Sequence, residues 1–233
     1  MRDNLSGVND AQILDLPLYT VTEAGRLLGI RPVTLKRWLE GYTARGTAHP
    51  PIIRPEPTGT EAVTWGEFVE AGFLRAYRSE MALQQLRPLV AVMRTEFGVR
   101  YPLAHFQPLV DRSKREAVSR LQEELGTPDV AVIVRWRNRQ LQWAEPVEEL
   151  LSTVEFDPFD AVARRMFPLG RDVPVAIDPE LSFGVPQVRG IRTEAIVELL
   201  DAGEPQEVVA QMWGLEDREI EAARKWEGYL KAA

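Results

Sequence analysis

The chain has 233 residues, of which 45% are apolar and 27% charged, a balance that is typical of a soluble globular protein. No apolar run approaches the roughly 18 residues of a transmembrane helix, and the amino terminus lacks the apolar stretch of a signal peptide. The absence of cysteine excludes disulfides and thiolate metal sites, and two histidines are too few for a histidine-rich one. We therefore expect a cytoplasmic protein without a membrane partner, a metal or a cofactor.

The net charge of −7 at first argues against nucleic acid as a partner, but the charge is unevenly distributed. Residues 19–54 carry a local charge of +4, from two acids, Glu23 and Glu40, and six bases: Arg26, Arg31, Lys36, Arg37, Arg45 and Arg54. Residues 201–231 carry eight acids and four bases, a local charge of −4. The amino-terminal part is thus the candidate for contact with phosphates.

Two short helices joined by a turn of about four residues are predicted near the start of the chain. Thr22 suits the N-cap of the first helix, whose apolar stripe ends at Gly29. Pro32 fits the first turn of the second helix, residues 33–40, which Gly41 closes. One face of that helix is apolar (Leu35, Trp38, Leu39), and five side chains are left outward: Val33, Thr34, Lys36, Arg37 and Glu40. This pattern predicts a helix-turn-helix.

A small β wing and two further helices are expected next. Residues 42–63 are rich in Pro, Gly and Thr, and 51–53 and 62–63 could pair as the wing. Thr64 and Glu67 have capping-box spacing and start a helix whose candidate buried positions are Phe68, Ala71, Leu74 and Tyr77. Apolar residues at helical intervals predict another helix over 83–97, in which Pro88 causes a late start or a bend.

The middle of the chain resembles a β-rich connector. Residues 129–136 form a β-type run, and 137–139 look like its turn. Residues 147–151 could form one or two helical turns. Short strands are expected at 153–156, 161–167 and 173–177, the first two joined by a turn at 157–160.

Three helices are predicted to complete the chain. The first is capped by Thr193 and ends near Gly203, and the second runs from Pro205 to about Trp213. The third, residues 217–230, places Ile220, Ala223, Trp226 and Leu230 on one face. Together they predict a second compact unit.

The outward face of the second helix favours binding of DNA. Insertion into the major groove needs polar or cationic side chains outside and apolar ones inside, and Thr34, Lys36 and Arg37 meet that need, with Arg31 in the turn before them. Arg37 could read a guanine edge or hold a phosphate. The alternative is a solvated helical hairpin that never meets DNA.

Two other sets of residues could carry a function. Five basic and aromatic residues could bind a single strand of nucleic acid, or simply surround a hairpin turn: Arg135, Trp136, Arg137, Arg139 and Trp143. Asp157, Asp160 and Asp178 could be metal carboxylates, but the first two flank a turn. His105 has no evident partner for catalysis. With no phosphate loop, nucleophile elbow or metalloprotease pattern, we expect no enzyme activity.

The amino-terminal string YTVTEAGRLLG, followed by PVTLKRWLEGY, resembles the start of MerR-like DNA-binding domains. That resemblance implies that the second helix is a recognition helix and that the turn and wing after it touch the DNA backbone. The positions that it implies for contact with DNA are Arg31, Thr34, Lys36, Arg37, Tyr42 and Arg45.

The carboxy-terminal string DPELSFGVP, with RGIRT and AGEP after it, resembles the helical domain numbered 433 in the series of unknown function. That domain occurs in antitoxins of the VapB type, whose partners are PIN-like ribonuclease toxins. The combination of head, connector and tail covers nearly the whole chain and is similar to one mycobacterial branch of those antitoxins.

The predicted fold is mainly α with a small β-rich connector. It is divided into an N-terminal arm (1–18), a MerR-like winged helix-turn-helix domain with its following helices (19–125), the connector (126–178) and a three-helix domain (179–233). The predicted function is a homodimeric antitoxin that binds double-stranded operator DNA, represses its own operon and neutralises a PIN-like ribonuclease toxin. The alternatives are a stand-alone MerR-like regulator that senses a small ligand and an interaction protein with a vestigial helix-turn-helix.

Overall fold

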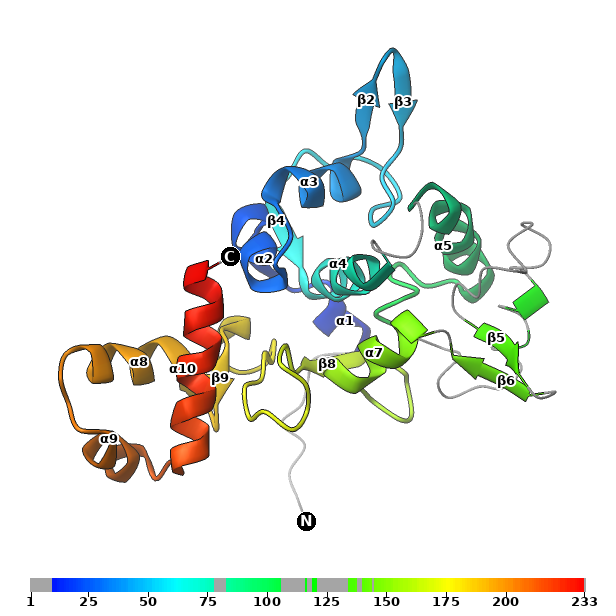
Figure 1. Ribbon diagram of the computed structural model, residues 1–233. Helices are drawn as coiled ribbons and strands as arrows, with labels where there is room; N and C mark the ends of the chain where they lie inside the picture. The colour runs from blue at the N-terminus through cyan, green and yellow to red at the C-terminus, as the bar shows by residue number, and fades with distance from the viewer. Residues whose placement is uncertain are drawn as a thin grey trace. The chain divides into compact units, whose positions relative to one another are not determined.

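The computed structural model describes residues 10–77, 83–105, 116, 119–120, 134–137, 140–143 and 145–232 (Figure 1). The chain divides into two compact units, the first made of residues 1–151 and 156–163 and the second of 152–155 and 164–233. The described part is mainly helical, and each of its sheets has two strands. The predicted fold class is therefore confirmed, whereas the four-part division of the chain stays a prediction.

The predicted helix-turn-helix is present in the first unit, after a short helix α1 (Asp10–Leu14) and a strand β1 (Pro17–Thr20). Helix α2 (Val21–Leu28) is capped by Thr20 and not by Thr22: the Thr20 hydroxyl accepts from the Glu23 N–H, and the Glu23 carboxylate accepts from the Thr20 N–H. This reciprocal pair is a capping box, so the helix begins two residues earlier than a Thr22 cap would allow.

Helix α3 (Pro32–Glu40) begins one residue before the predicted start and ends where predicted, with Pro32 in its first turn and Gly41 at its C-cap. Its turn with α2 is so tight that a Cβ on Gly25 would lie 2.6 Å from the Ile30 carbonyl oxygen. The Ile30 N–H donates to the Gly25 carbonyl in the same turn, at 2.7 Å. Only glycine therefore fits at position 25 without a shift of the turn that sets α3 against α2.

The wing is a hairpin of β2 (Tyr42–Ala44) and β3 (Thr47–His49), with Ala44 opposite Thr47. Both turn residues, Arg45 and Gly46, have positive φ (50° and 78°), as in the two-residue turns that suit the twist of antiparallel strands. The predicted wing strands were wrong: residues 51–53 are buried bends, and 62–63 belong to another strand. Short apolar pieces were a poor guide to the wing, because Ile52, Ile53 and Val63 are buried in the core.

That other strand, β4 (Ala62–Thr64), pairs antiparallel with β1 and leads into α4 (Trp65–Tyr77). The predicted capping box is confirmed, since the Thr64 hydroxyl accepts from the Glu67 N–H and the Glu67 carboxylate accepts from the Thr64 N–H. Phe68, Ala71 and Leu74 are buried as expected, and the side chain of Tyr77 lies outside the described set. Helix α5 (Leu83–Phe97) includes Pro88, so the helix did not start late.

The remaining described elements of the first unit are β5 (Val134–Arg137), β6 (Gln140–Trp143) and α7 (Glu145–Thr153), whose last two residues belong to the second unit. Strands β5 and β6 form an antiparallel hairpin, with Arg137 opposite Gln140. Residues 129–133 and 138–139 of the predicted strand and turn lie outside the described residues.

The chain crosses between the units within β7 (Val154–Phe156) and β8 (Ala163–Met166), which pair with each other and are joined by the predicted turn at 157–160. The strand expected at 173–177 was wrong, because only isolated bridges occur there, from Ile177 to Met166 and from Ala176 to Gln187. A short 3-10 turn, η2 (Ser182–Gly184), and a hairpin of β9 (Gln187–Val188) and β10 (Ile191–Arg192) follow.

The three predicted carboxy-terminal helices are α8 (Thr193–Asp201), α9 (Gln206–Trp213) and α10 (Asp217–Ala232). All four residues predicted for the buried face of α10 are buried: Ile220, Ala223, Trp226 and Leu230. Thr193 does not cap α8 as predicted, because it is the first helical residue and is itself buried. Its hydroxyl contacts the Pro186 carbonyl and donates to the Glu227 carboxylate at 2.6 Å, which ties the start of α8 to α10.

Candidate nucleic-acid interface

The outer face of α3 is the part of the helix-turn-helix that a ligand can reach. Leu35, Trp38 and Leu39 are buried, as the sequence predicts. Of the six residues predicted to touch DNA, Thr34 is half-buried and five are exposed: Arg31, Lys36, Arg37, Tyr42 and Arg45. Helix α3 is therefore packed on one side and presents a mostly polar outer surface, as docking in a groove requires.

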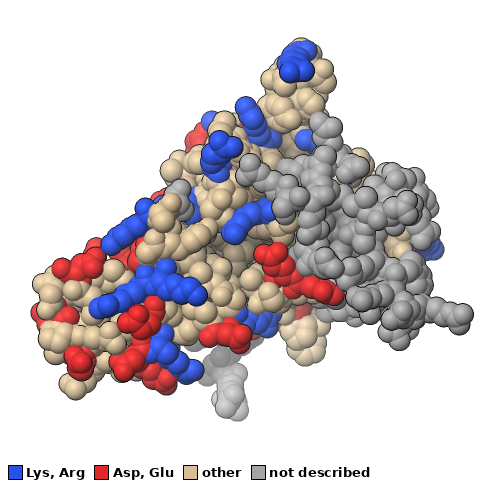
Figure 2. Space-filling model, in the orientation of Figure 1, with Lys and Arg blue, Asp and Glu red and all other residues tan. Residues whose placement is uncertain are grey.

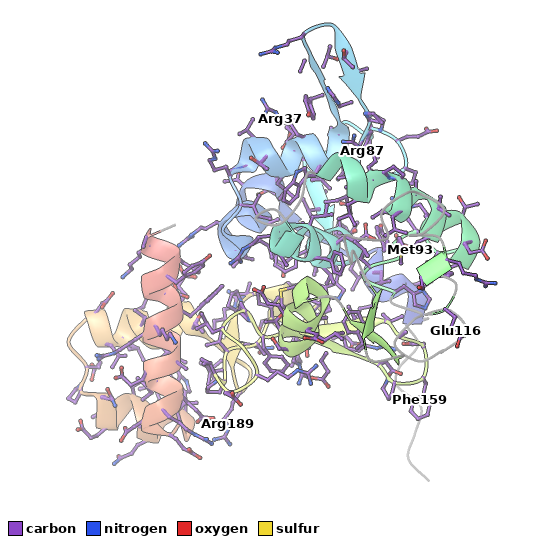
Figure 3. All side chains as sticks on the ribbon, turned by 45° about the vertical axis from the view of Figure 1, so that its right-hand side comes forward. Arg37, Arg87, Met93, Glu116, Phe159 and Arg189 are labelled. Carbon is purple, nitrogen blue, oxygen red and sulfur yellow. The ribbon has the colours of Figure 1, made fainter. Side chains whose placement is uncertain are left out.

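The Arg37 side chain lies over an aromatic ring at the base of the wing. It points outward from α3, on the side from which the hairpin projects (Figure 3). Its guanidinium carbon lies 5.3 Å from the ring centre of Tyr42, within cation–π distance. The Tyr42 ring in turn stacks on His49 of β3, with ring centres 4.5 Å apart and planes 19° apart. This stack joins the outer face of α3 to the base of the wing.

Lys36 is paired within the protein. Its ammonium group lies 2.5 Å from a carboxylate oxygen of Glu61, and both side chains are more than half exposed. The hydrogen bond and charge of Glu61 raise the pKa of Lys36 above its ordinary value. An exposed pair of this kind is weak in water, so Lys36 can exchange Glu61 for a phosphate at little cost.

Arg45 lies at the tip of the wing. Its φ of 50° is in the left-handed region, and an arginine there is less favourable than glycine, asparagine or aspartate. The space-filling view shows basic side chains over the hairpin and over α3 on the face drawn (Figure 2). The wing thus carries a cation at a position where turn geometry alone would favour another residue.

Arg54 was counted from the sequence among the surface cations, but it is only 2% exposed. It donates two hydrogen bonds to Glu67, at 2.7 and 3.0 Å, and forms an ion pair with Glu40. Its remaining acceptors are the Thr58 hydroxyl and the carbonyls of Thr60 and Ala62. Glu40, predicted to face outward, is instead a structural partner that fixes the end of α3.

The pairing of Glu40 and Arg54 is reflected in their pKa values. Burial alone would raise the pKa of Glu40, but hydrogen bonds from the Gly59 and Thr58 N–H groups and the Thr58 hydroxyl, with the charge of Arg54, hold it below its ordinary value. Burial likewise lowers the pKa of Arg54, and the two carboxylates raise it further than burial lowers it. Both groups therefore stay charged, and because one acid and one base are withdrawn together, the surface charge of residues 19–54 stays at +4.

A second buried carboxylate lies between α4 and α5. Glu70 of α4 is fully buried, and burial raises its pKa to about 8. One of its oxygens accepts from the Leu103 N–H at 3.1 Å, and the other lies 3.8 Å from Arg94 of α5. Arg94 also donates to the Ile53 carbonyl at 2.7 Å, so it connects α5 to the segment that follows the wing.

The other candidate sites from the sequence play structural parts. The carboxylates of Asp157 and Asp160 accept backbone N–H groups in the turn between β7 and β8, and Asp178 pairs with Arg165 at 2.9 Å. His105 bonds the Asp160 carbonyl at 2.7 Å. Among the described residues no group of three or more side chains could hold a metal ion, and no described helix is long and apolar enough to cross a membrane.

For the basic and aromatic hairpin, the register of β5 and β6 is described but its side chains, and Arg139 altogether, lie outside the described set. A single-strand site there stays untested.

The second unit has a mixed surface. Of the eight acids in residues 201–231, Glu219 is buried and Glu227 half-buried, whereas all four bases are exposed, so the predicted local charge of −4 falls to −2 at the surface. Four large apolar side chains are exposed on this unit: Leu181, Phe183, Val208 and Met212. Phe183 is 80% exposed in a left-handed conformation with φ of 56°.

Comparison with known proteins gives matches to the helix-turn-helix and to nearly the whole chain. A family model described as "Putative DNA-binding HTH domain" matches residues 17–90. In Mycobacterium tuberculosis, the uncharacterized protein Rv2308 is 33% identical over 216 residues, which cover 91% of this chain and 90% of the relative. The protein named "Putative antitoxin VapB45" from the same organism is 30% identical over 217 residues, which cover 86% of this chain and 90% of the relative.

The crystal structure of Rv2018 from Mycobacterium tuberculosis is similar over 91% of this chain and 99% of that protein, with a TM-score of 0.71 and 29% identity. The whole fold, and not only the helix-turn-helix, is therefore shared. These likenesses support a DNA-binding protein of the helix-turn-helix type that is related to a protein named as a putative antitoxin.

Proposed function

The chain belongs to the family that contains the mycobacterial proteins Rv2308 and VapB45, and from that premise we propose that it is the antitoxin of a toxin–antitoxin pair. It binds double-stranded operator DNA, represses its own operon and neutralises a PIN-like ribonuclease toxin. In this proposal the head is of the MerR-like type and the tail belongs to the helical family numbered 433. The observation that carries the DNA-binding half is the outer face of α3, where Arg37 is held by Tyr42 beside other exposed cations.

The proposed docking places α3 in the major groove and the wing along the backbone. Thr34 and Arg37 then face base edges, and Arg31 and Lys36 face phosphates on either side. Arg45, at the tip of the hairpin, contacts the backbone farther from the groove. Because Tyr42 and His49 already order Arg37, less side-chain entropy is lost when it binds.

The proposed homodimer explains how a small module could select one operator. A two-fold dimer presents two copies of α3 to the two halves of a palindrome, about one helical turn apart. The combined contact area and charge then exceed those of one copy. Repression follows when the operator overlaps the promoter of the operon that encodes the protein.

The proposed toxin-binding surface lies on the second unit. Its support is the set of exposed apolar side chains, Leu181, Phe183, Val208 and Met212, since buried aromatic and aliphatic anchors dominate the affinity of protein interfaces. The acidic excess of this unit is too small at the surface to carry the argument alone, although it would favour a cationic partner.

The DNA-binding half is tested by titrating the full-length protein against the DNA upstream of its own reading frame. We expect binding to weaken steeply with salt, because Lys and Arg displace counterions from phosphates. Arg37→Ala should weaken binding by about 1–3 kcal/mol if the side chain contacts a base. The matched control is Arg224→Ala, which removes an exposed arginine from α10. Equal affinity of both variants and the wild type would remove Arg37 from the interface.

The antitoxin half is tested by recovering the tagged full-length protein from its native host and identifying what co-purifies. We expect a PIN-like ribonuclease, whose activity the protein inhibits when the two are mixed. Phe183→Ala should weaken that complex, whereas the control Phe159→Ala, an exposed aromatic of the first unit, should not. Operator binding without a nuclease partner would instead favour the stand-alone regulator.

A further inference from the structure

The outer face of α3 carries one side chain whose exposure the fold does not explain. Val33 is 56% exposed and lies in the first turn of the helix. Among the described residues of the first unit, the other large apolar side chains that are exposed are Tyr42, which stacks with Arg37 and His49, and Phe159 in the turn after β7. Val33 is thus an apolar group on a surface that is otherwise polar and cationic.

Valine contributes little to the stability of the free protein at this position. β-Branched residues are poorer helix formers than alanine, lysine or glutamate, and an exposed side chain contributes little burial energy. The branched side chain is, however, stiff about its first torsion angle in a helix, so its two methyl groups hold a fixed direction. A fixed apolar group on a recognition surface is suited to reading an apolar feature of the ligand.

The neighbours of Val33 place it where base edges are read. Residues 33 and 37 are four apart on one helix, so the Val33 methyl groups lie on the same side of α3 as the Arg37 guanidinium. Val33 and Lys36 are three apart and are neighbours on the adjoining side. The first turn of a recognition helix is also the part that contacts base edges most directly in helix-turn-helix proteins.

The major groove offers one apolar group at its base edges, the C5-methyl of thymine. We propose that Val33 is a specificity-determining residue that packs against the C5-methyl of a thymine in each operator half-site, beside the base or phosphate contacted by Arg37. This inference rests on the proposed binding of DNA and adds a base, thymine, that the outer face of α3 selects. A phosphate or sugar contact would leave the isopropyl group without a matching surface, whereas a thymine methyl removes both apolar groups from water.

The test replaces each thymine of an operator half-site in turn by deoxyuridine, which lacks only the methyl group and keeps every hydrogen-bonding atom. For the wild-type protein we expect one position per half-site at which the replacement weakens binding about fourfold, the value of one buried methyl group. The Val33→Ala variant should bind the thymine and uracil forms of that position equally. Val33→Thr, which keeps one methyl group, should retain a loss of about twofold.

The matched control is Val208→Ala, which trims an exposed valine of α9 and should leave the full sensitivity to the methyl group. Circular dichroism and melting temperature verify that each variant is folded, as expected for an exposed position. Wild-type binding that is indifferent to uracil at every position overturns the inference while the binding of DNA stands, and so does a Val33→Ala variant that keeps the sensitivity. Failure of the wild type to bind its operator at all overturns the proposed function itself.

Discussion

The two units both bury acidic side chains, but they differ in whether the paired arginine is buried too. In the first unit, Glu40, Glu67 and Glu70 are withdrawn from the surface and hold arginines or backbone groups inside. The outer face of α3 and the wing are thereby left to cations. In the second unit Asp178 and Glu219 are buried as well, but their partners Arg165 and Arg189 are 40% and 59% exposed. The net charge of a sequence segment therefore predicts the charge at its surface only when the buried charged side chains are known.

The largest expected effect concerns the buried arginine of the first unit. Arg54→Met removes the partner of Glu40 and Glu67 and should lower the free energy of unfolding by about 3–5 kcal/mol, because it leaves buried carboxylates uncompensated. Arg165→Met is the counterpart in the second unit, where the arginine is 40% exposed beside Asp178. We expect it to cost about 1 kcal/mol, since water replaces much of the lost contact.

Urea titration of both variants checks this contrast, with the tryptophan fluorescence of the full chain as the signal. Equal costs would show that the network around Arg54 does not hold the end of α3. That outcome would also remove the reason for expecting α3 to be rigid.

The pH dependence of the first unit gives the next effect. The pKa of Glu70 is about 8 in the folded protein, against an ordinary value of 4.5 in the unfolded chain. Between pH 4.5 and pH 8 the folded protein therefore holds a proton on Glu70 that the unfolded chain has lost. Its stabilising contribution is complete below about pH 4.5 and is lost as the pH rises through 8. Relative to Glu70→Gln, the wild type should lose about 3 kcal/mol between pH 5 and pH 8. Melting curves of both proteins at each pH measure the difference, and parallel curves would contradict the assignment.

Two helical glycines, one in each unit, should respond to substitution by alanine in opposite directions. Gly25→Ala places a Cβ 2.6 Å from the Ile30 carbonyl oxygen and should destabilise the helix-turn-helix by about 1–3 kcal/mol. Gly228→Ala in α10 meets no atom within 4 Å and should instead stabilise the second unit by about 0.5–1 kcal/mol. Thermal unfolding of the two single variants tests both signs. A loss at position 228 as large as that at 25 would mean that crowding is not what distinguishes them.

The smallest expected effect concerns the exposed ion pair between Lys36 of α3 and Glu61. Glu61→Gln removes a negative charge next to Lys36 and should tighten binding of the operator by about twofold at low salt, with less effect at high salt. Asp201→Asn removes the same charge beside Lys231 in the second unit and should leave binding of DNA unchanged. Fluorescence anisotropy at two salt concentrations distinguishes a local effect from a change in total charge.

The sequence predicted best where a single residue type enforces the backbone. Pro32 and Gly41 set the ends of α3, and the spacing of Thr64 and Glu67 set the start of α4. The cap of α2 was misplaced although Thr20 and Glu23 have the same spacing as that second pair, so a search for the motif would have found it.

The parts that could not be predicted depend on contacts between distant residues. Arg54 and Glu40 are 14 positions apart, and Arg54 and Glu67 are 13 apart, so nothing local shows that one cation of the basic segment is buried. The stack of Arg37, Tyr42 and His49 depends likewise on the register of a hairpin whose strands were predicted elsewhere. The residues proposed to contact DNA stay predictions.

The way α3 is anchored has a consequence for engineering. Its inner residues, Leu35, Trp38 and Leu39, and its last residue, Glu40, hold the helix, whereas Val33, Lys36 and Arg37 contribute little to its packing. Different side chains of the same nine-residue helix therefore pack against the protein and face the proposed DNA. Libraries randomised only at the outer positions should yield folded variants. Selection from such libraries could then give proteins of the same fold that bind other operator sequences.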